Sequence, residues 1–327
     1  MCRRSYWPPR IYFHKALYQR VILISEDVWG APFEELSKRR SIHQDPNLWE
    51  DRSKLIEAIK DAEALVVRNR TKVTAEIIAA APKLKVIARA GVGLDNIDIA
   101  AADNAGVVVV AGLGANAVAV AELTLSLALS LSRNIATQDK ITKAGSWNRT
   151  AGIEITGKTW GLLGCGATGR ATAHLLKGFN CKVLGYDPFF QGNQEIQMAS
   201  LDEVISQSDV ISVHMPATAE TVGSINKVFF AKMKPTALLI NVGRGELVNE
   251  TDLKNALKDK QMAGAALDVR VNEPPTIGEL ENLENIILTP HIAGITKESQ
   301  LAINKILVDN IELVLDGKKA THSVGKI

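Results

Sequence analysis

The stretch that decides the fold runs from residue 159 to residue 169 and reads TWGLL GCGATG. Its first half, 159–163, is a short apolar run typical of a buried strand. Its second half, 164–169, has the spacing G-x-G-x-x-G. The residues from Arg170 to Lys177 predict a helix, and a second strand over Lys182–Tyr186 ends at Asp187. Strand, glycine turn, helix and acidic strand end together predict a dinucleotide-binding unit.

Each glycine of the turn has a steric reason to be there. Gly164 allows the tight turn, Gly166 lets the backbone approach a pyrophosphate, and Gly169 permits close packing of the helix on the strand. The helix N-terminus then offers unsatisfied N–H groups to phosphates. A glycine-rich structural turn is the alternative, and the strand, helix and acid around this turn argue against it.

Asp187 predicts which dinucleotide is bound. It lies 18 residues after Gly169, close to the interval of about 20 expected for the acid that holds the adenosine ribose. Its charge would repel a 2′-phosphate, and residues 188–190 (Pro-Phe-Phe) offer no arginine to hold one. The prediction is NAD rather than NADP. Cys165 within the turn invites a redox-switch hypothesis, but a small side chain at a variable position is the simpler interpretation.

Strand-like and helix-like segments alternate along the chain, which predicts a parallel α/β fold. Before the glycine turn, strands are expected at 21–24, 64–67, 85–88 and 107–110, and helices at 53–62 and 74–81. After Asp187, strands are expected at 210–213, 237–240, 264–267 and 286–288, and a long helix at 297–315 ends at Gly317. A chain of 327 residues is too long for one ordinary core. We therefore expect two doubly wound parallel-sheet domains, a flavodoxin-like substrate domain at 21–113 plus 295–327 and a Rossmann cofactor domain at 114–294.

Composition excludes several classes of protein. Hydrophobic residues make up 46% and charged residues 23%, as in globular proteins, and a net charge of +2 gives no reason to expect nucleic acid or an acidic membrane as a partner. Residues 1–20 hold five Lys and Arg and no acid, which favours a basic N-terminal extension of no catalytic role over a transit peptide, and they lack the apolar core of a signal peptide. Cys2, Cys165 and Cys181 show neither metal spacing nor an even disulfide set. We therefore expect no metal, reduced thiols and a cytoplasmic location.

The segment from Val107 to Ser132 tests the expected cytoplasmic location. It carries one charge, Glu122, and is long enough to cross a bilayer. Glycines and polar residues interrupt it. Leu123–Ser132 alternates apolar and polar residues, which alone favours a strand, but the run of about twenty residues around it has no turn signal and exceeds a typical strand. We expect a buried strand followed by a buried helix.

Candidate reacting groups lie at predicted strand ends, where α/β sheets place ligands. Arg244 is framed by glycines in Asn241-Val242-Gly243-Arg244-Gly245 and suits a carboxylate, although a structural ion pair is the alternative. Glu273 follows the strand-end Asp268 by five residues and is either a partner for an imidazole or a loop carboxylate. His214 and His291 each follow a strand. For His291, an acid/base role and a buried ring satisfied by a carbonyl both stay open on position alone.

From about Val21 to Gly317 the chain resembles the D-isomer-specific 2-hydroxy-acid dehydrogenases. The matching segments are the glycine turn with Asp187, Val213–Pro216, Asn241–Glu246, Ala266–Val269 through Glu273-Pro274, and Thr289–Gly294. The resemblance implies an NAD-dependent oxidoreductase that interconverts a 2-hydroxy acid and a 2-oxo acid by hydride transfer. It implies that Arg244 binds the substrate, that His291 is the acid/base, and that Glu273 orients His291. A carboxylate beside the ring favours imidazolium, the form that donates a proton when an oxo acid is reduced.

The resemblance also implies a set of cofactor contacts. Asp268 is expected near the nicotinamide carboxamide, and the loop around His214 and Met215 beside the cofactor riboses. The residues expected to bind NAD are Gly164, Gly166, Ala167, Thr168, Gly169, Asp187, His214, Met215, Pro216, Thr221, Val242, Gly243, Arg244, Asp268, His291 and Gly294.

The substrate residues are expected in the first domain. Arg89–Asn96 resembles the family's carboxylate loop, with the backbone N–H groups of Val92 and Gly93 on the acid. Val67–Thr71 resembles the segment that presents an arginine to the distal phosphate in phosphoglycerate dehydrogenases. Arg68 falls on that position, Arg70 is an extra cation, and we expect the two to share a face of the strand end. They indicate a substrate with a second anionic group, such as 3-phosphoglycerate, sulfolactate or a dicarboxylic hydroxy acid, unless both are merely solvated or ion-paired.

The resemblance extends to assembly and to competing functions. Residues 114–147 resemble the family's dimerisation region and predict a homodimer. The chain stops shortly after its last helix, so we expect no C-terminal regulatory domain and no serine feedback through one. Glyoxylate/hydroxypyruvate reduction is the leading alternative activity, and formate dehydrogenase is disfavoured because that subfamily has glutamine where Glu273 stands. A corepressor-like NAD-sensing protein, from a different class, can retain the same three residues.

Overall fold

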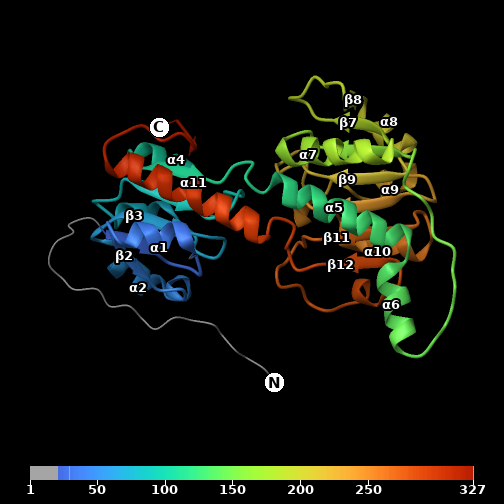
Figure 1. Cartoon of the computed structure of the whole chain (residues 1–327), viewed down its shortest axis with the longest axis horizontal. Coiled ribbons are helices and arrows are strands. Elements are labelled where there is room, and N and C mark those ends of the chain that lie inside the picture. The colour runs from blue at the N-terminus through green and yellow to red at the C-terminus, as the bar shows by residue number, and fades with distance from the viewer. Residues whose placement is uncertain (1–20, 29, 327) are drawn as a thin grey trace. The chain divides into compact units, whose positions relative to one another are not determined.

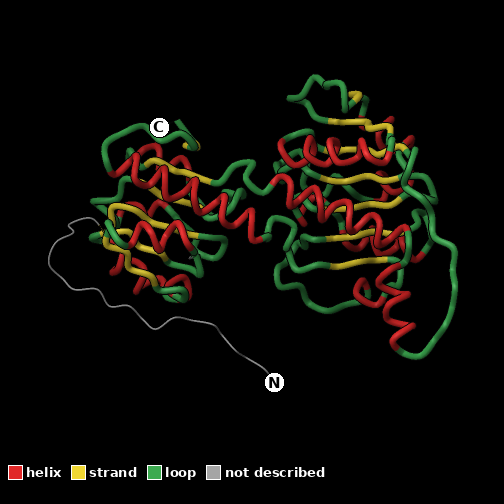
Figure 2. Tube along the Cα trace, viewed as in Figure 1, coloured by secondary structure: helices red, strands yellow, loops and turns green. Residues whose placement is uncertain are grey.

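The computed structural model describes residues 21–28 and 30–326. The basic extension predicted at 1–20 lies outside the described residues. The chain forms two compact units, one made of the described residues up to Leu113 together with those from Gln300 onward, the other Gly114–Ser299. Figure 1 labels their elements, and Figure 2 shows helices and strands by type. The chain returns to the first unit at Gln300, five residues after the expected position.

The first unit is built on five parallel strands. They are β1 (Val21–Ile24), β2 (Ser41–Gln44), β3 (Ala62–Val67), β4 (Val86–Arg89) and β5 (Val108–Ala111). Their order, 2-1-3-4-5, is that of flavodoxin-like sheets, and β13 (Ser323–Val324) adds an antiparallel edge to β5. One face packs on α2 (Arg52–Ile59), α3 (Ala75–Ala79) and α4 (Ile99–Asn104). The opposite face carries α1 (Ala31–Ser37) and α11 (Lys297–Leu315), as Figure 1 shows.

The second unit has seven strands, all parallel. They are β6 (Thr159–Leu163), β7 (Lys182–Tyr186), β8 (Gln197–Met198), β9 (Val210–Val213), β10 (Leu238–Asn241), β11 (Gly264–Leu267) and β12 (Ile286–Leu288). The order β12-β11-β10-β9-β6-β7-β8 is the Rossmann order with one further strand. Alternate strand residues face α5 (Ala117–Ser132) and α7 (Ala167–Leu176) on one side. They face α8 (Leu201–Gln207), α9 (Lys227–Lys232) and α10 (Glu250–Lys258) on the other.

The fold class predicted from the sequence, two doubly wound α/β units, is confirmed. Several details differ from the prediction, most strand bounds by only one or two residues, and three of them matter most. α2 ends at Ile59, and Ala62, expected at the helix end, begins β3. The helix after the glycine turn begins at Ala167 rather than Arg170, so Gly169 lies inside it. β2 was not predicted, because Ser41-Ile42-His43-Gln44 contains no apolar run.

The apolar segment 107–132 forms β5 and then α5, so the choice of helix over strand is confirmed. Residues of α5 such as Leu127 and Ala128 pack on the strands of the second sheet. Within residues 21–28 and 30–326, no single helix is long and apolar enough to cross a membrane. Only the bent pair of α5 and α6 (Ile135–Lys143) meets the length and composition criteria together.

Candidate active site

The candidate residues of the second unit gather at one edge of its sheet, because each follows the carboxyl end of a parallel strand. Ligands of open α/β sheets bind at this edge, where the strand order reverses. Here the reversal lies between β6 and β9, so the loops after these two strands flank it. The residues at this edge are Gly164 after β6, Asp187 after β7, His214 after β9, Arg244 after β10, Asp268 and Glu273 after β11, and His291 after β12.

The glycine turn has the shape that a dinucleotide requires. Gly164 has a φ of +96°, and a Cβ there would lie 2.8 Å from the backbone nitrogen of Met215. A Cβ on Gly169 would lie 2.2 Å from the carbonyl oxygen of Gly164, so helix and turn are in direct contact. A Cβ on Gly166 would meet nothing within 4 Å, which leaves the backbone there open to a ligand. These residues fit a pyrophosphate, with the N-terminus of α7 beside it.

Asp187 is held by the backbone around it. Its Oδ2 accepts a hydrogen bond from the N–H of Cys165 at 2.7 Å, and its Oδ1 accepts one from Phe189 at 2.8 Å. Each oxygen keeps a lone pair for a ribose hydroxyl. Sequence reasoning missed Arg170, whose guanidinium lies 5.7 Å from the ring centre of Phe190 and donates to the carbonyl of Cys165 at 2.9 Å. The available signal was the arginine directly after the last glycine.

Cys165 is packed rather than reactive. Burial, together with the neighbouring charge of Asp187, raises the pKa of its thiol to about 12. At neutral pH the thiol is therefore protonated, and a protonated thiol is a weak nucleophile. A Cβ on Gly185 would lie 2.7 Å from the Sγ of Cys165, so the thiol fills space against β7. This packing favours the simple interpretation over a redox switch.

His214 is a neutral, half-buried ring. Its Nε2 lies 2.9 Å from the Oγ of Ser212, which accepts a hydrogen bond from the Nε1 of Trp160 at 2.8 Å. Burial lowers the pKa of His214 to about 3. Such a ring does not suit acid/base chemistry at neutral pH. Its Nδ1 is buried without a partner among the described residues, which leaves one polar atom for a ligand bound beside the turn.

We expect His214→Gln to flatten the acid side of the stability profile of the ligand-free protein. Below pH 6.5 the unfolded chain takes up a proton at this ring, whereas the folded chain does so only near pH 3. Each pH unit in that window costs the folded state at most about 1.4 kcal/mol, less where solvent reaches the ring. Melting curves between about pH 7 and about pH 4 check this, with a steeper fall of Tm for the wild type. Parallel curves for the two proteins would contradict it.

Arg244 lies in a turn that its neighbours shape. Asn241 accepts a hydrogen bond from the N–H of Gly243 at 3.1 Å and donates one to the carbonyl of Arg244 at 2.9 Å. A Cβ on Gly245 would lie 2.0 Å from the carbonyl carbon of Arg270, so the turn presses on the backbone after β11. The half-buried guanidinium donates through Nη1 to the carbonyl of Gly243 at 2.8 Å. Asn241 was missed by sequence reasoning, and its position at a strand end was the signal.

Asp268 is buried and organises the loop that carries His291. Its Oδ1 accepts from the Oγ1 of Thr289 at 2.5 Å and from the N–H of Ile292 at 2.9 Å, and its Oδ2 accepts from Ala293 at 2.8 Å. The N–H of His291 donates to the carbonyl of Asp268 at 2.8 Å. His291 has a φ of +55°, a left-handed conformation that is unfavourable for a non-glycine residue. The bonds to Asp268 hold the loop in that conformation.

The imidazole of His291 pairs with Glu273. Nδ1 of the ring lies 2.7 Å from Oε2 of the carboxylate, and Oε1 accepts from the N–H of Arg270 at 3.1 Å. The side chains of His291 and Glu273 are 49% and 35% exposed, so a ligand can reach the ring. Because Nδ1 faces a carboxylate it carries a proton, and Nε2 is left to give or take one. The structure therefore brings His291 and Glu273 together, as the resemblance implied.

Arg270 anchors the segment from which Glu273 reaches the ring. Its guanidinium donates to both oxygens of Glu250 at 2.9 Å each and to Glu281 at 2.8 Å. Hydrogen bonds to Glu250 and Glu281 raise the pKa of Arg270 above its ordinary value. This residue was missed too, because its partners lie 20 and 11 residues away and nothing local marks it.

The other expected cofactor residues lie on loops at the same edge. The Oγ1 of Thr221 donates to the carbonyl of Pro216 at 2.9 Å and accepts from the N–H of Thr218 at 2.7 Å, so it shapes its own loop. A Cβ on Gly294 would lie 2.5 Å from the Nδ2 of Asn116, which brings the start of α5 against the loop after β12. Asn116 keeps a buried Oδ1 with no partner among the described residues.

The first unit places its four candidates on loops after β3 and β4. Val92 and Gly93 follow β4, and their N–H groups meet no acceptor within the described part of the chain. Arg68 is half-buried, whereas Arg70 is exposed and its guanidinium lies 4.7 Å from the ring centre of Trp49. The expectation that both arginines share a strand face is wrong, because β3 ends one residue before Arg68 and the chain then bends.

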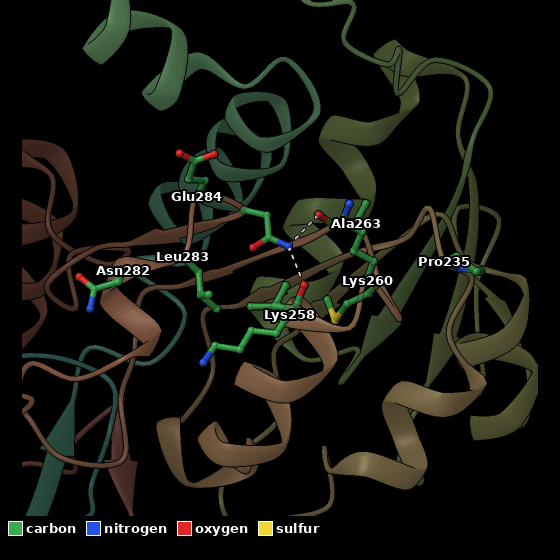
Figure 3. Close-up of a pocket in the computed structure, with 10 residues that line it drawn as sticks. Pro235, Lys258, Lys260, Ala263, Asn282, Leu283 and Glu284 are labelled. Atoms are coloured by element: carbon green, nitrogen blue, oxygen red, sulfur yellow. Dashed lines mark hydrogen bonds between the residues drawn. The ribbon is translucent and has the colours of Figure 1, made fainter.

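A hollow in the second unit lies away from these residues (Figure 3). It is lined by the segments that precede β10, β11 and β12, where Asn285 donates to the carbonyls of Leu257 at 3.3 Å and Ala263 at 3.4 Å. These segments enter the strands at their amino ends, so the hollow lies at the edge opposite the candidate site. Across the described residues, no group of three or more His, Cys, Asp or Glu side chains is arranged to hold a metal.

Fold and site together define a dinucleotide-binding α/β protein with a histidine–carboxylate pair at the sheet edge that also carries the glycine turn. A profile of the D-isomer specific 2-hydroxyacid dehydrogenase, NAD binding domain, matches residues 125–293, and the chain belongs to this family. The resemblance seen in the sequence is thereby confirmed, and so is NAD, the cofactor predicted from Asp187.

Individual relatives agree with this assignment. D-3-phosphoglycerate dehydrogenase of Archaeoglobus fulgidus is 42% identical over 84% of this chain and 53% of its own length. The crystal structure of a protein from Thermus thermophilus superposes with a TM-score of 0.87 at 29% identity, covering 93% of this chain and 99% of that one. A glyoxylate reductase from Paecilomyes thermophila gives 0.85 at 28% identity, over 94% and 99%. The chain spans about half the length of the curated relatives it matches.

Proposed function

We propose that this protein is an NAD-dependent oxidoreductase that interconverts a 2-hydroxy acid and a 2-oxo acid. The observation that carries the proposal is the pair of His291 and Glu273, 2.7 Å apart at the sheet edge that also carries the glycine turn and Arg244. Hydride transfer to or from a carbinol carbon requires a proton donor or acceptor at its oxygen and a cation at the neighbouring carboxylate. This edge supplies both.

Each residue has a defined part in this proposal. NAD, which the glycine turn and Asp187 would hold, would supply the hydride acceptor for the hydroxy acid and, in its reduced form, the hydride donor for the oxo acid. His291 takes the hydroxyl proton through Nε2 in one direction and donates it in the other. Glu273 orients the ring through Nδ1 and stabilises the imidazolium. Arg244 holds the carboxylate and the carbonyl oxygen through its planar guanidinium.

We further propose a substrate with a second anionic group, of which 3-phosphoglycerate is the first candidate. Arg68 and Arg70 on the loop after β3, and the N–H groups of Val92 and Gly93 after β4, support an anion site on the first unit. Relatives named D-3-phosphoglycerate dehydrogenase support the choice of a phosphate. Sulfolactate is the alternative dianion. Glyoxylate or hydroxypyruvate reduction is the second candidate activity, and the similarity to a glyoxylate reductase supports it.

The test is a substrate panel with NADH and NADPH, run on the wild type and on Arg68→Ala. Candidates are the oxo acids of 3-phosphoglycerate, sulfolactate and glycerate, with glyoxylate. We expect NADH oxidation with dianionic acids, and a KM for these raised by about tenfold or more in Arg68→Ala, since a charge-assisted contact contributes about that much. Monoanionic acids should keep their KM. A variant with the same loss of kcat/KM for both kinds of acid would contradict the distal-anion site. A wild type that oxidises NADH with none of them would favour the binding-protein class.

We also propose a cytoplasmic homodimer that pairs through residues 114–147. In the single chain Val118, Ile135 and Trp147 are 60%, 53% and 78% exposed, and large exposed apolar side chains support an interface on this segment. Cys165 and Cys181 are free thiols, as in proteins of a reducing compartment. Sedimentation equilibrium of the wild type and of Trp147→Glu tests the dimer, and a monomeric wild type would contradict it.

A further inference from the structure

Glu26, two residues after the end of β1, is a buried carboxylate that accepts hydrogen bonds from four backbone N–H groups. The residue is only 2% exposed. Oε1 accepts hydrogen bonds from the N–H of Arg68 at 2.7 Å and of Thr71 at 2.9 Å. Oε2 accepts from Asn69 at 3.2 Å and Arg70 at 3.0 Å. The whole loop that carries both arginines is therefore folded around one carboxylate.

The carbonyl side of the same loop is held as well. The Nδ2 of Asn96 donates to the carbonyl oxygens of Arg68 at 3.1 Å and Thr71 at 2.7 Å. The hydroxyls of Ser25 and Thr71 lie 2.8 Å apart, which ties the loop end to the end of β1. Glu26 thus fixes the donors and Asn96 the acceptors of a four-residue loop.

The loop conformation gives the two arginines different surroundings. Arg70 is exposed and stacks on Trp49, whereas Arg68 is half-buried beside the loop that carries Asn96. An extended strand would have put both side chains on one face, two residues apart. The bend around Glu26 separates them, and of the two arginines Arg68 has no aromatic partner among the described residues.

We propose that Glu26 is the positioning residue of the distal-anion subsite, setting the loop so that Arg68 rather than Arg70 receives the second anionic group. This inference rests on the proposed function. By its charge alone Glu26 would repel an anion bound on this loop, because like charges a few ångströms apart disfavour each other. Burying a carboxylate is also unfavourable unless its lone pairs are satisfied. Glu26 instead contributes by fixing the conformation of the loop. If repulsion dominates, replacing Glu26 with a neutral residue should lower the KM for the anionic substrate, and if the loop conformation dominates, it should raise that KM.

The test is Glu26→Gln with the substrate panel. Glutamine has one acceptor oxygen, so at most two of the four N–H groups keep their partner, while the charge is removed. We expect the KM for the dianionic oxo acids to rise by about tenfold or more, with kcat and the KM for hydroxypyruvate changed by less than about twofold. Glu26→Asp keeps both oxygens and the charge and should lie between the wild type and Glu26→Gln. Glu57→Gln, at an exposed glutamate paired with Lys60, is the matched control and should behave as the wild type.

The outcomes are decisive in either direction. A lower KM for dianions in Glu26→Gln means that charge, not geometry, dominates, and overturns the inference; so does an equal loss with mono- and dianionic acids. Amide hydrogen exchange at residues 68–71 gives an answer independent of turnover, even if the wild type reduces no oxo acid and the proposed function fails. Faster exchange in Glu26→Gln, or in Glu26→Asp if the glutamine variant does not fold, supports the positioning role. Unchanged exchange overturns it.

Discussion

Replacing His291 by alanine is expected to abolish turnover while NADH still binds. The ring is oriented for proton transfer, because its Nδ1 is held by Glu273 at 2.7 Å and its Nε2 is left for the substrate. Removing a general acid/base lowers kcat by about 10²- to 10⁴-fold. NADH affinity should fall little, since the glycine turn and Asp187 belong to other loops. NADH oxidation measures turnover, and quenching of protein fluorescence by NADH measures binding.

A second variant at His291 is needed because of the backbone conformation of this residue. Its φ of +55° is unfavourable for alanine, so a loss in His291→Ala alone could come from a loop that has moved. Asparagine tolerates this conformation, and His291→Asn should lose turnover to the same extent with the loop in place. His174→Ala, at an exposed histidine on α7, is the matched control and should keep full activity. Loss of NADH binding together with turnover in His291→Asn would contradict the acid/base assignment.

Much of the fold was predictable because parallel sheets buried on both faces leave a simple trace in the sequence. Strands such as 159–163, 182–186 and 264–267 are largely apolar runs, and they were predicted with their bounds. β2 lies at the edge of its sheet, where Ser41, His43 and Gln44 are at least partly exposed, so it carries no such run. Edge strands and helix ends depend on neighbours that the local sequence does not reveal.

The residues of the site likewise fall into a group that the local sequence predicts and a group that it does not. Residues that act at strand ends follow the strand pattern, which is why Asp187, Arg244 and His291 were predictable as candidates. Residues that hold those candidates in place do so over long separations: Glu26 is 42 residues from Arg68, and Arg270 is 20 residues from Glu250. The expectation that Arg68 and Arg70 share a face of the strand end failed for this reason. It assumed an extended strand end, and the carboxylate that bends the chain belongs to the loop after another strand.

The second large effect is expected when two glycines of the same turn are replaced by alanine. One replacement should lower stability, and the other should weaken NADH binding. Gly169→Ala should lose stability, because a Cβ there would lie 2.2 Å from the carbonyl oxygen of Gly164 and the helix must move off the turn. Overpacking of this kind costs about 1 to 3 kcal/mol, and Tm should fall accordingly. Gly166→Ala should melt as the wild type, since its Cβ would meet nothing within 4 Å in the ligand-free protein.

Gly166→Ala, which should be as stable as the wild type without ligand, should be the variant that binds NADH poorly. The space that a Cβ on Gly166 would occupy is the open backbone surface that a pyrophosphate must approach, so Gly166→Ala should bind NADH about tenfold or more weakly while remaining folded. Melting curves with and without NADH measure both the stability of the ligand-free protein and its affinity for NADH, because stabilisation grows with the ratio of ligand concentration to Kd. The wild type should gain Tm with NADH, and Gly166→Ala should gain little from an unchanged starting value. If Gly166→Ala gains as much as the wild type, the pyrophosphate does not lie on this turn, and the inference from Gly164, Gly166 and Gly169 to a cofactor fails at its physical basis.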